Sequence, residues 1–145
     1  MPEVIGIDHT YLTVTDIAVS EQFYDRALLQ VLGCRKNRFE LGGDPHIQYD
    51  NRWFGLVLRP ARVAAPHQAY APGLHHFCLR EESAAEVEQV AAHLQQLGIA
   101  ASTPKLYPDY APDYKATFFQ DPDGIRLEVT NYRQERRDRH DEQMD

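Results

Sequence analysis

Three residues of this sequence, His9, His76 and Glu128, have the chemistry of metal ligands. Imidazole nitrogens and a carboxylate bind divalent zinc, nickel, manganese and iron. Three protein donors leave coordination positions open for water and a substrate, which is typical of a catalytic site and not of a closed structural one. We therefore predict that these side chains bind one divalent ion (zinc, nickel, manganese or iron). Glu128 is also a candidate catalytic residue.

Strand geometry sets the direction in which each of these side chains points. The three residues fall in predicted strands that span Ile5 to Val14, Leu74 to Arg80 and Ile125 to Asn131. Because successive residues of a strand point to opposite faces, all three lie opposite the apolar residues that a helix covers. A carboxylate buried there without a partner costs several kcal/mol, which a divalent cation compensates. The alternative is that the histidines and the glutamate are hydrogen-bonded interior residues.

The predicted elements occur twice in the order strand, helix, strand, strand, strand. One helix is predicted from Ile17 to Leu32, with Asp16 as its N-cap. The other spans residues 83–97, where Ser83 and Glu86 form a capping box. The remaining strands are predicted at Cys34 to Leu41, Pro45 to Tyr49, Phe54 to Arg59, Ile99 to Leu106 and Tyr114 to Gln120. The sequence therefore predicts an α+β fold of two βαβββ modules related by internal duplication.

The predicted domain organisation follows from this duplication. Residues 1–133 are expected to form a single domain, with modules at 1–60 and 73–133 and a Pro- and Ala-rich connector at 61–72. Residues 134–145 are expected to be a charged tail. The basic residues from Arg133 to Arg139 are interleaved with acidic ones, which is typical of solvated surface.

Five further side chains are candidates for catalysis or for substrate binding. Tyr110, Tyr114 and Lys115 belong to a Pro- and Tyr-rich segment and can orient an anionic or aromatic substrate. Tyr114 is the second candidate catalytic residue. Arg126 shares a face with Glu128 and can bind a carboxylate or phosphate, and the Gln48 amide can support a bound water or substrate. Their structural alternatives are surface packing of the tyrosines, a rim salt bridge and an ordinary polar strand position.

Composition restricts the classes of partner. The 145-residue chain has a formal net charge of −7, whereas nucleic-acid binding requires clustered Lys and Arg, so we expect no nucleic-acid partner. The sequence has no run of about 18 apolar residues and no apolar leader, so we expect a cytoplasmic protein without a membrane partner. Cys34 and Cys78 are too few for a disulfide scaffold. The other histidines, His46, His67, His93 and His140, carry no spacing signal and are assigned no role.

The residues around the predicted ligands resemble the vicinal oxygen chelate superfamily. The resemblance rests on IDHTYLTVTDIAVSEQFYDRALLQVLG in the first half and on GLHHFCLR and FFQDPDGIRLEVTN in the second. This superfamily includes glyoxalase I, extradiol dioxygenases, fosfomycin-resistance transferases and bleomycin-resistance proteins. The resemblance implies mixed sheets that curl around a cleft. It also implies the ligand set His9, His76 and Glu128, on the first and last strands of the modules.

In function, the resemblance implies a metal-dependent enzyme that binds a small oxygen-rich substrate and stabilises an oxyanion or enolate. Lyase, isomerase, transferase and dioxygenase reactions all pass through such species, so the ligands do not distinguish them. Glyoxalase I uses a fourth ligand where this chain has Val57, and the fosfomycin transferases use a Thr where it has Tyr11. Extradiol dioxygenases tend to be longer. The alternative is a non-catalytic drug-binding protein of the bleomycin-resistance type. A homodimer is expected because curled sheets leave edges for a partner to cover.

Overall fold

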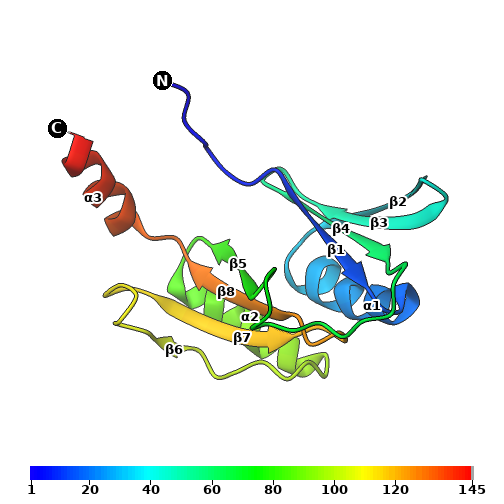
Figure 1. Ribbon diagram of the computed structural model, residues 1–145. Coiled ribbons are helices and arrows are strands. Elements are labelled where there is room, and N and C mark those ends of the chain that lie inside the picture. The colour runs from blue at the N-terminus through cyan, green and yellow to red at the C-terminus, as the bar shows by residue number, and fades with distance from the viewer. Residues whose placement is uncertain (145) are drawn as a thin grey trace. The chain divides into compact units, whose positions relative to one another are not determined.

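The computed structural model describes residues 1–144, which divide into two compact units (Figure 1). Unit 1 comprises Met1–Gln68 together with the turn Asp121–Gly124, and unit 2 comprises Ala69–Gln120 together with the chain from Ile125 onward. Each unit holds one four-stranded mixed sheet and a helix that follows its first strand. The predicted α+β fold of two βαβββ modules is therefore confirmed. Both sheets are open and do not close into a barrel.

Unit 1 contains the first module. Its elements are β1 His9–Val14, α1 Ile17–Tyr24, the π-helical segment η1 Asp25–Val31, β2 Arg35–Leu41, β3 Asp44–Asp50 and β4 Gly55–Pro60. The strand order is β1-β4-β3-β2, with β1 parallel to β4 and the other pairs antiparallel. The Asp16 carboxylate accepts hydrogen bonds from Ala18 N (3.0 Å) and Val19 N (3.2 Å), as predicted for an N-cap.

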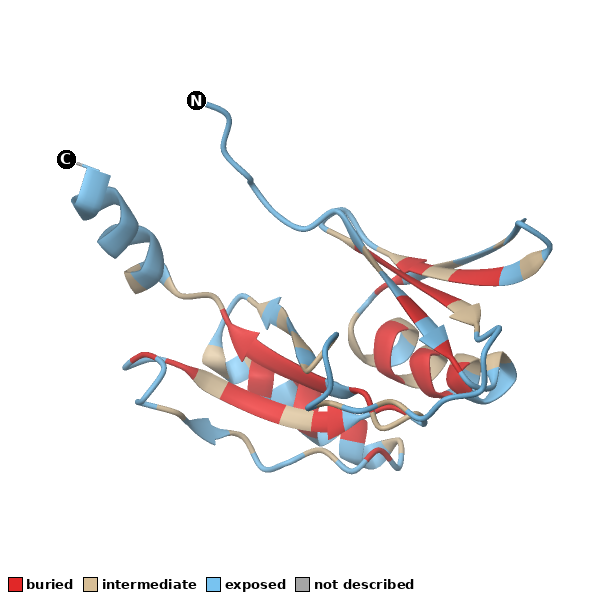
Figure 2. Cartoon of the chain, viewed as in Figure 1, coloured by how far each residue is buried: buried red, intermediate tan, exposed pale blue. Residues whose placement is uncertain are grey.

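Unit 2 repeats this arrangement. Its elements are β5 His76–Glu81, α2 Ala84–Gln96, β6 Lys105–Leu106, β7 Lys115–Gln120, β8 Arg126–Asn131 and α3 Gln134–Met144. The strand order is β5-β8-β7-β6, with β5 parallel to β8. α2 packs on one face of this sheet, and Figure 2 shows buried residues along α2 and the strands that it covers. We call the opposite face of the unit 2 sheet its open face. His76, Cys78, Arg80, Phe118, Arg126, Glu128 and Thr130 lie on it.

The strand registers make the internal duplication explicit. The paired positions are His9 with Gly55 and Tyr11 with Val57 in unit 1, and His76 with Arg126 and Cys78 with Glu128 in unit 2. In both units, the residue two positions after the histidine is paired with a residue of the last strand. Val57 and Glu128 occupy this equivalent position. The pairing therefore makes Val57 and Glu128 structural equivalents in the two modules.

Two predicted boundaries in the first module need correction. The helix expected over residues 17–32 is α-helical only as far as Tyr24 and continues as π-helix from Asp25. The change in helix type coincides with a contact from β3, whose Tyr49 hydroxyl bonds to the Glu21 carbonyl (3.3 Å) and to the Asp25 carboxylate (2.8 Å). The strand expected from Ile5 begins only at His9, because its partner β4 begins at Gly55, opposite His9.

The strand expected at Ile99 to Leu106 is reduced to the two residues of β6. The chain before β6 runs beside β7, but side chains make many of its bonds. Ser102 N donates to Phe118 O (2.9 Å), the Ser102 hydroxyl accepts from Phe118 N (2.9 Å), and Thr117 Oγ1 donates to Ser102 O (2.7 Å). Pro104 has no N–H for a ladder. Hydrogen bonds from side chains thus take the place of part of the backbone pairing that a regular strand needs.

The C-terminal residues also differ from the expectation. Residues 134–144 of the expected charged tail form helix α3, and the final residue lies outside the described part of the chain. α3 buries no residue, so its exposed charges agree with the predicted solvated surface. Among residues 1–144, no helix is both long and apolar enough to cross a membrane.

A buried hydrogen bond ties the turn Asp121–Gly124 to α1 within unit 1. The Tyr24 hydroxyl donates to the Asp121 carboxylate at 2.8 Å, and both residues are buried. Burial and this carboxylate raise the pKa of Tyr24 well above its usual value, so the hydroxyl remains a donor. The sequence gap of 97 residues between the partners shows that the bond closes a long loop.

We expect Tyr24→Phe to lower the free energy of unfolding by about 1–3 kcal/mol, because a buried carboxylate loses a hydrogen-bond donor. Urea unfolding followed by circular dichroism measures the change. Tyr70→Phe is the matched control, since Tyr70 is exposed. Equal stability of the two variants would contradict this assignment.

Candidate metal and substrate site

Two of the three predicted metal ligands lie together on the open face of the unit 2 sheet. His76 Nε2 is 3.3 Å from Glu128 Oε1, and Glu128 is only 4% exposed. They come from the neighbouring parallel strands β5 and β8. His9, the third predicted ligand, belongs to β1 of unit 1. Within residues 1–144, no group of three His, Cys, Asp or Glu side chains is arranged to hold a metal ion.

The His76 and Glu128 donors fit a shared divalent ion. Two donors that are each about 2.1 Å from one ion, at angles between octahedral and tetrahedral, lie about 3.0–3.4 Å apart. The observed separation of 3.3 Å falls in this range. One imidazole nitrogen and one carboxylate oxygen are suitable donors for zinc and for other divalent transition metals.

Tyr114 sets the orientation of the Glu128 carboxylate. Its hydroxyl donates a hydrogen bond to Glu128 Oε2, which leaves Oε1 on the side of His76. Burial and the hydrogen bond to Glu128 raise the pKa of Tyr114 above its ordinary value, so the phenol stays protonated. The structure thus places the candidate Tyr114 behind the carboxylate, where it acts through Glu128.

In both modules the residue before the histidine contacts its Nδ1 atom. Asp8 Oδ2 is 2.7 Å from His9 Nδ1, and His75 Nδ1 is 2.8 Å from His76 Nδ1. With Nδ1 engaged in this way, Nε2 is the ring nitrogen left for a metal. Asp8 has no other signal in the sequence than its place before His9, which matches that of His75 before His76.

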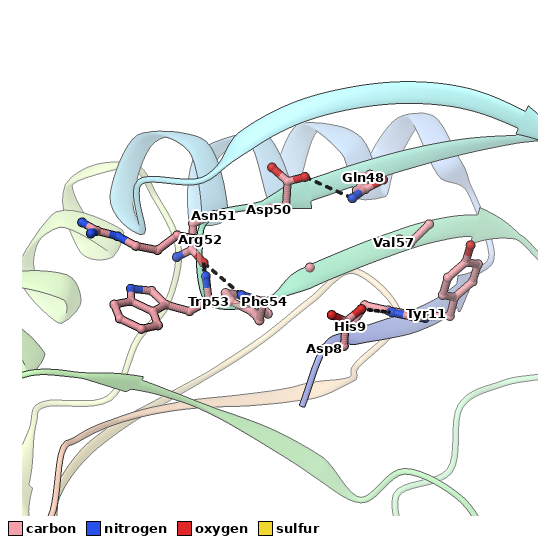
Figure 3. A pocket seen from close by; sticks show the side chains of 11 residues that line it. Asp8, His9, Tyr11, Gln48, Asp50, Asn51, Arg52, Trp53, Phe54 and Val57 are labelled. Atoms are coloured by element: carbon pink, nitrogen blue, oxygen red, sulfur yellow. Dashed lines mark hydrogen bonds and ion pairs between the residues drawn. The ribbon is translucent and has the colours of Figure 1, made fainter. Parts of the chain in front are cut away.

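His9 lies at the edge of a pocket of about 370 Å³ in unit 1, a volume within the range of small-molecule sites (Figure 3). The lining residues are Asp8, His9, Tyr11, Gln48, Asp50, Asn51, Arg52, Trp53, Phe54, Gly55 and Val57. The candidate Gln48 donates to the Asp50 carboxylate at 3.1 Å. The Asn51 carboxamide oxygen accepts from Trp53 N and Phe54 N, which holds the loop that presents the exposed Trp53 ring. Gln48 therefore faces the same pocket as His9.

His46 is a buried residue of the unit 1 sheet, although its sequence position suggested no role. It lies on β3, two residues before Gln48, and is only 2% exposed. Its ring stacks on Phe39 at 4.9 Å between centroids and meets the edge of Tyr11 at 5.9 Å. The alternation of the predicted strand at residues 45–49 was the available signal. His46 supports the pocket side of the unit 1 sheet by packing beside Tyr11.

A cluster of aromatic rings adjoins Glu128 in unit 2. We define the aromatic cluster as Tyr107, Tyr110, Tyr114 and Phe118. Ring centroids are 5.5 Å apart for Tyr107 and Phe118 and 5.1 Å apart for Tyr110 and Tyr114. The candidate Tyr110 is 64% exposed, whereas Tyr114 is buried. Together they form an apolar wall beside the carboxylate.

The loop that carries these tyrosines is held in place by Asn131 and by backbone bonds. Asn131 Oδ1 accepts from Lys115 N (2.9 Å), and its Nδ2 donates to Asp113 O (3.0 Å). Tyr107 N donates to Tyr114 O at 2.8 Å. A buried amide at the end of β8 therefore fixes the loop relative to the strand that carries Glu128.

The structure separates the remaining candidates. Arg126 is exposed on the open face and pairs in register with His76, close to the proposed donors. Lys115 instead extends its ammonium to Glu88 of α2, which lies on the other face of the sheet. Lys115 is therefore left out of the proposed site.

Arg133 departs from the solvated surface predicted for the stretch from Arg133 to Arg139. It is partly buried, and its guanidinium carbon lies 4.8 Å from the centroid of the Tyr114 ring. Its Nε atom is buried and has no hydrogen-bond partner among the described residues. The sequence does not distinguish Arg133 from the other charged residues of this stretch, because the stretch continues into the exposed helix α3.

Comparison with known proteins agrees with the fold. The sequence profile of the glyoxalase/bleomycin resistance protein/dioxygenase superfamily matches residues 6–129. The chain therefore belongs to this superfamily. A protein of Escherichia coli strain K12, the uncharacterised YaeR, is 31% identical over 128 residues, which cover 85% of this chain and 93% of YaeR.

Solved structures resemble the chain in fold. A glyoxylase/bleomycin resistance protein/dioxygenase domain from Frankia sp. EAN1pec matches with a TM-score of 0.74 and 22% identity, covering 90% of this chain and all of that domain. A lactoylglutathione lyase from Agrobacterium tumefaciens matches with a TM-score of 0.62 and 22% identity, over 90% and 94% of the two chains. At these identities the similarity shows the shared fold alone.

We expect Asn131→Ala to loosen the loop of the aromatic cluster, because three hydrogen bonds of the buried amide are lost. Hydrogen exchange at Tyr110 and its neighbours should accelerate, and the free energy of unfolding should fall by about 1–3 kcal/mol. Asn37→Ala, an exposed site on β2, is the control. Unchanged exchange in Asn131→Ala would show that other contacts hold the loop.

Proposed function

We propose that this chain is a metal-dependent enzyme of the vicinal oxygen chelate type, with His9, His76 and Glu128 as the ligands of one divalent ion. The observation that carries the proposal is the pairing of His76 Nε2 with Glu128 Oε1 at 3.3 Å, with Tyr114 on the second carboxylate oxygen. A buried carboxylate arranged in this way fits a cation better than it fits an empty interior. His9 supplies the third donor, with Nδ1 engaged by Asp8.

A divalent ion bound by these residues supplies Lewis acidity toward the oxygens of a substrate. Glu128 contributes the negative charge of the site through Oε1. Tyr114 is a positioning residue, because its hydroxyl fixes the carboxylate and touches Oε2. His75 engages Nδ1 of His76 and leaves Nε2 facing Glu128. Val57, which has no donor atom, keeps the equivalent position of unit 1 free of a fourth ligand.

The substrate class implied by the superfamily is a small oxygen-rich molecule. The pocket beside His9 adds the Gln48 amide, which can donate to and accept from hydroxyl groups of such a molecule, and the Asp50 carboxylate, which can accept from them. Arg126 on the open face can hold an acidic group. Lyase, isomerase, transferase and dioxygenase chemistry all remain compatible with this set of residues.

Zinc titration of the metal-free chain tests the ligand assignment by calorimetry. We expect one site, with Glu128→Gln, His76→Ala and His9→Ala each weakening binding by more than the roughly 10–100-fold typical of losing an outer hydrogen-bond partner. Tyr114→Phe should fall within that 10–100-fold range, because it leaves all three donors in place. Circular dichroism establishes that each variant is folded.

The control for the zinc titration is His140→Ala, an exposed histidine of α3. Its zinc affinity should equal that of the wild type. Wild-type affinity in Glu128→Gln and His76→Ala would place the site elsewhere. The drug-binding protein of the bleomycin-resistance type, which needs no catalytic metal, would then be the better description.

We further propose that the chain forms a homodimer. Its N-terminal segment carries Val4, Ile5 and Ile7, all of which are largely exposed, and apolar side chains of this size favour burial against a partner. Light scattering should give twice the chain mass of 16.7 kDa at micromolar concentration. Ile5→Asp combined with Ile7→Asp should shift the mass toward the monomer, whereas Val63→Asp, at an exposed site of the connector, should not. A monomeric wild type would contradict the proposal.

Mixing variants determines whether the donors of one site come from one chain or from two. His9→Ala and Glu128→Gln chains are unfolded together, refolded and titrated with zinc. If each site takes His9 from one copy and His76 with Glu128 from the other, about a quarter of the sites are restored by random pairing. If each site forms within one chain, none is restored.

A further inference from the structure

The open face of the unit 2 sheet is positively charged although the chain as a whole carries −7. Along its strands this face presents Arg80, Arg126 and Lys105, and Glu128 is the one carboxylate among the strand residues described on it. Arg133 adds a further cation beside Tyr114. A concentration of positive charge on an acidic protein favours an anionic ligand at that face.

Arg133 is the cation with an unused hydrogen-bond donor. Its Nε is buried and has no hydrogen-bond partner among residues 1–144, and an unpaired buried donor is costly. Arg80 stacks over Tyr132, and Lys105 lies over the Tyr107 ring. The backbone just before Arg133 is tied to the end of β5, because Tyr132 N donates to Glu81 O at 2.7 Å.

The aromatic cluster supplies the second half of a ligand site. Arg133 covers one face of Tyr114, and Tyr110, which is tilted against Tyr114 at 5.1 Å, is largely exposed. An exposed aromatic ring next to buried ones offers a flat apolar surface to a planar ligand. Asn131 holds the loop that presents this surface, so little ordering is needed on binding.

We propose that Arg133 and the aromatic cluster form a subsite for an aromatic carboxylate. The ligand's ring packs against Tyr110, and its carboxylate accepts hydrogen bonds from the Arg133 guanidinium. The planar guanidinium fork matches a carboxylate, which makes this pairing stronger than one with a neutral hydroxyl. The proposal deepens the proposed function, because it gives a ligand class to the face that carries His76 and Glu128, but its test does not depend on a metal.

The main competing explanation for the position of Arg133 is the negative charge of Glu128. Arg133 lies over Tyr114, whose hydroxyl donates to Glu128. In the competing explanation, the only role of the guanidinium is to balance the charge of this buried carboxylate. If Arg133 only balances charge, ligand affinity should not depend on an aromatic ring or on a carboxylate in the ligand. If it belongs to a binding subsite, ligand affinity should depend on both groups. Asp109 and Asp113 of the adjoining loop are exposed to solvent.

The experiment measures benzoate, cyclohexanecarboxylate and benzyl alcohol binding to the full chain by NMR titration. It is carried out on metal-free protein and on protein with one equivalent of zinc. We expect benzoate to bind about tenfold more tightly than either of the other probes in at least one form, since only benzoate has both a flat ring and a carboxylate. Arg133→Gln should weaken benzoate binding about tenfold and abolish its advantage over benzyl alcohol.

Two further variants separate the subsite from a general charge effect. Arg136→Gln removes an equal charge from exposed α3 and should leave benzoate affinity unchanged. Tyr110→Ala should remove the advantage of benzoate over cyclohexanecarboxylate and keep the dependence on Arg133. Equal losses in Arg133→Gln and Arg136→Gln would overturn the proposal, as would the absence of benzoate binding in both forms of the protein.

The outcome is independent of the ligand assignment for zinc. Benzoate binding that depends on Arg133 in a chain that binds no zinc would support the subsite and reject the proposed metal site. Unaltered zinc affinity in Arg133→Gln, together with lost benzoate binding, would support both proposals. Zinc binding without any selectivity for benzoate would leave the proposed function in place and reject the subsite.

Discussion

The burial of the Glu128 carboxylate is the constraint on which the rest of unit 2 depends. A carboxylate that is 4% exposed must be hydrogen-bonded or compensated by charge. The structure meets this need from two directions, the hydroxyl of Tyr114 and the imidazole of His76, and Arg133 lies over the Tyr114 ring. Tyr114 reaches the carboxylate from a loop that Asn131 bonds on both sides of it, at Asp113 O and at Lys115 N. The end of β8, the loop and the aromatic cluster are therefore organised around one charge.

The parallel pairing of first and last strands explains why the site is built where it is. In each module this pairing brings a residue near the start of the module next to one near its end, so two distant parts of the sequence meet on one face. The helix occupies the other face and buries the alternate, apolar side chains. A βαβββ module thus provides one apolar face for stability and one polar face for chemistry, and duplication provides two.

Most of the fold followed from local patterns in the sequence. Alternation identified the strands at His9, His76 and Glu128, and the N-caps Asp16 and Ser83 marked both helix starts. The failures have physical causes that local patterns do not contain. The π-helical turn after Tyr24 coincides with a hydroxyl from β3, and the segment before β6 is bonded through side chains of Ser102 and Thr117. Such contacts are made by residues far apart in the sequence.

For the candidate site, residue type and alternation were sufficient to identify His76 and Glu128 as neighbours, but not to identify their partners. Arg133 was concealed by the charged stretch that follows it, and Lys115 turned toward α2 because its strand position faces the helix. Asp8 gave no signal until its bond to His9 Nδ1 was known. Direction along a strand is readable from sequence, whereas the reach of a long side chain is not.

The contrast between Gly55 and Arg126 has a consequence for how such a protein can diversify. They occupy equivalent places in the two modules, each opposite a histidine, yet one has no side chain and the other a long cation. A Cβ at Gly55 would lie at ordinary contact distance from His9, Gln48 and Asp50, so small substitutions are sterically tolerated there. Unit 1 can therefore change the shape of its pocket by single mutations while the charge balance around Glu128 in unit 2 is preserved. Duplication in this way lets the two polar faces vary independently of each other.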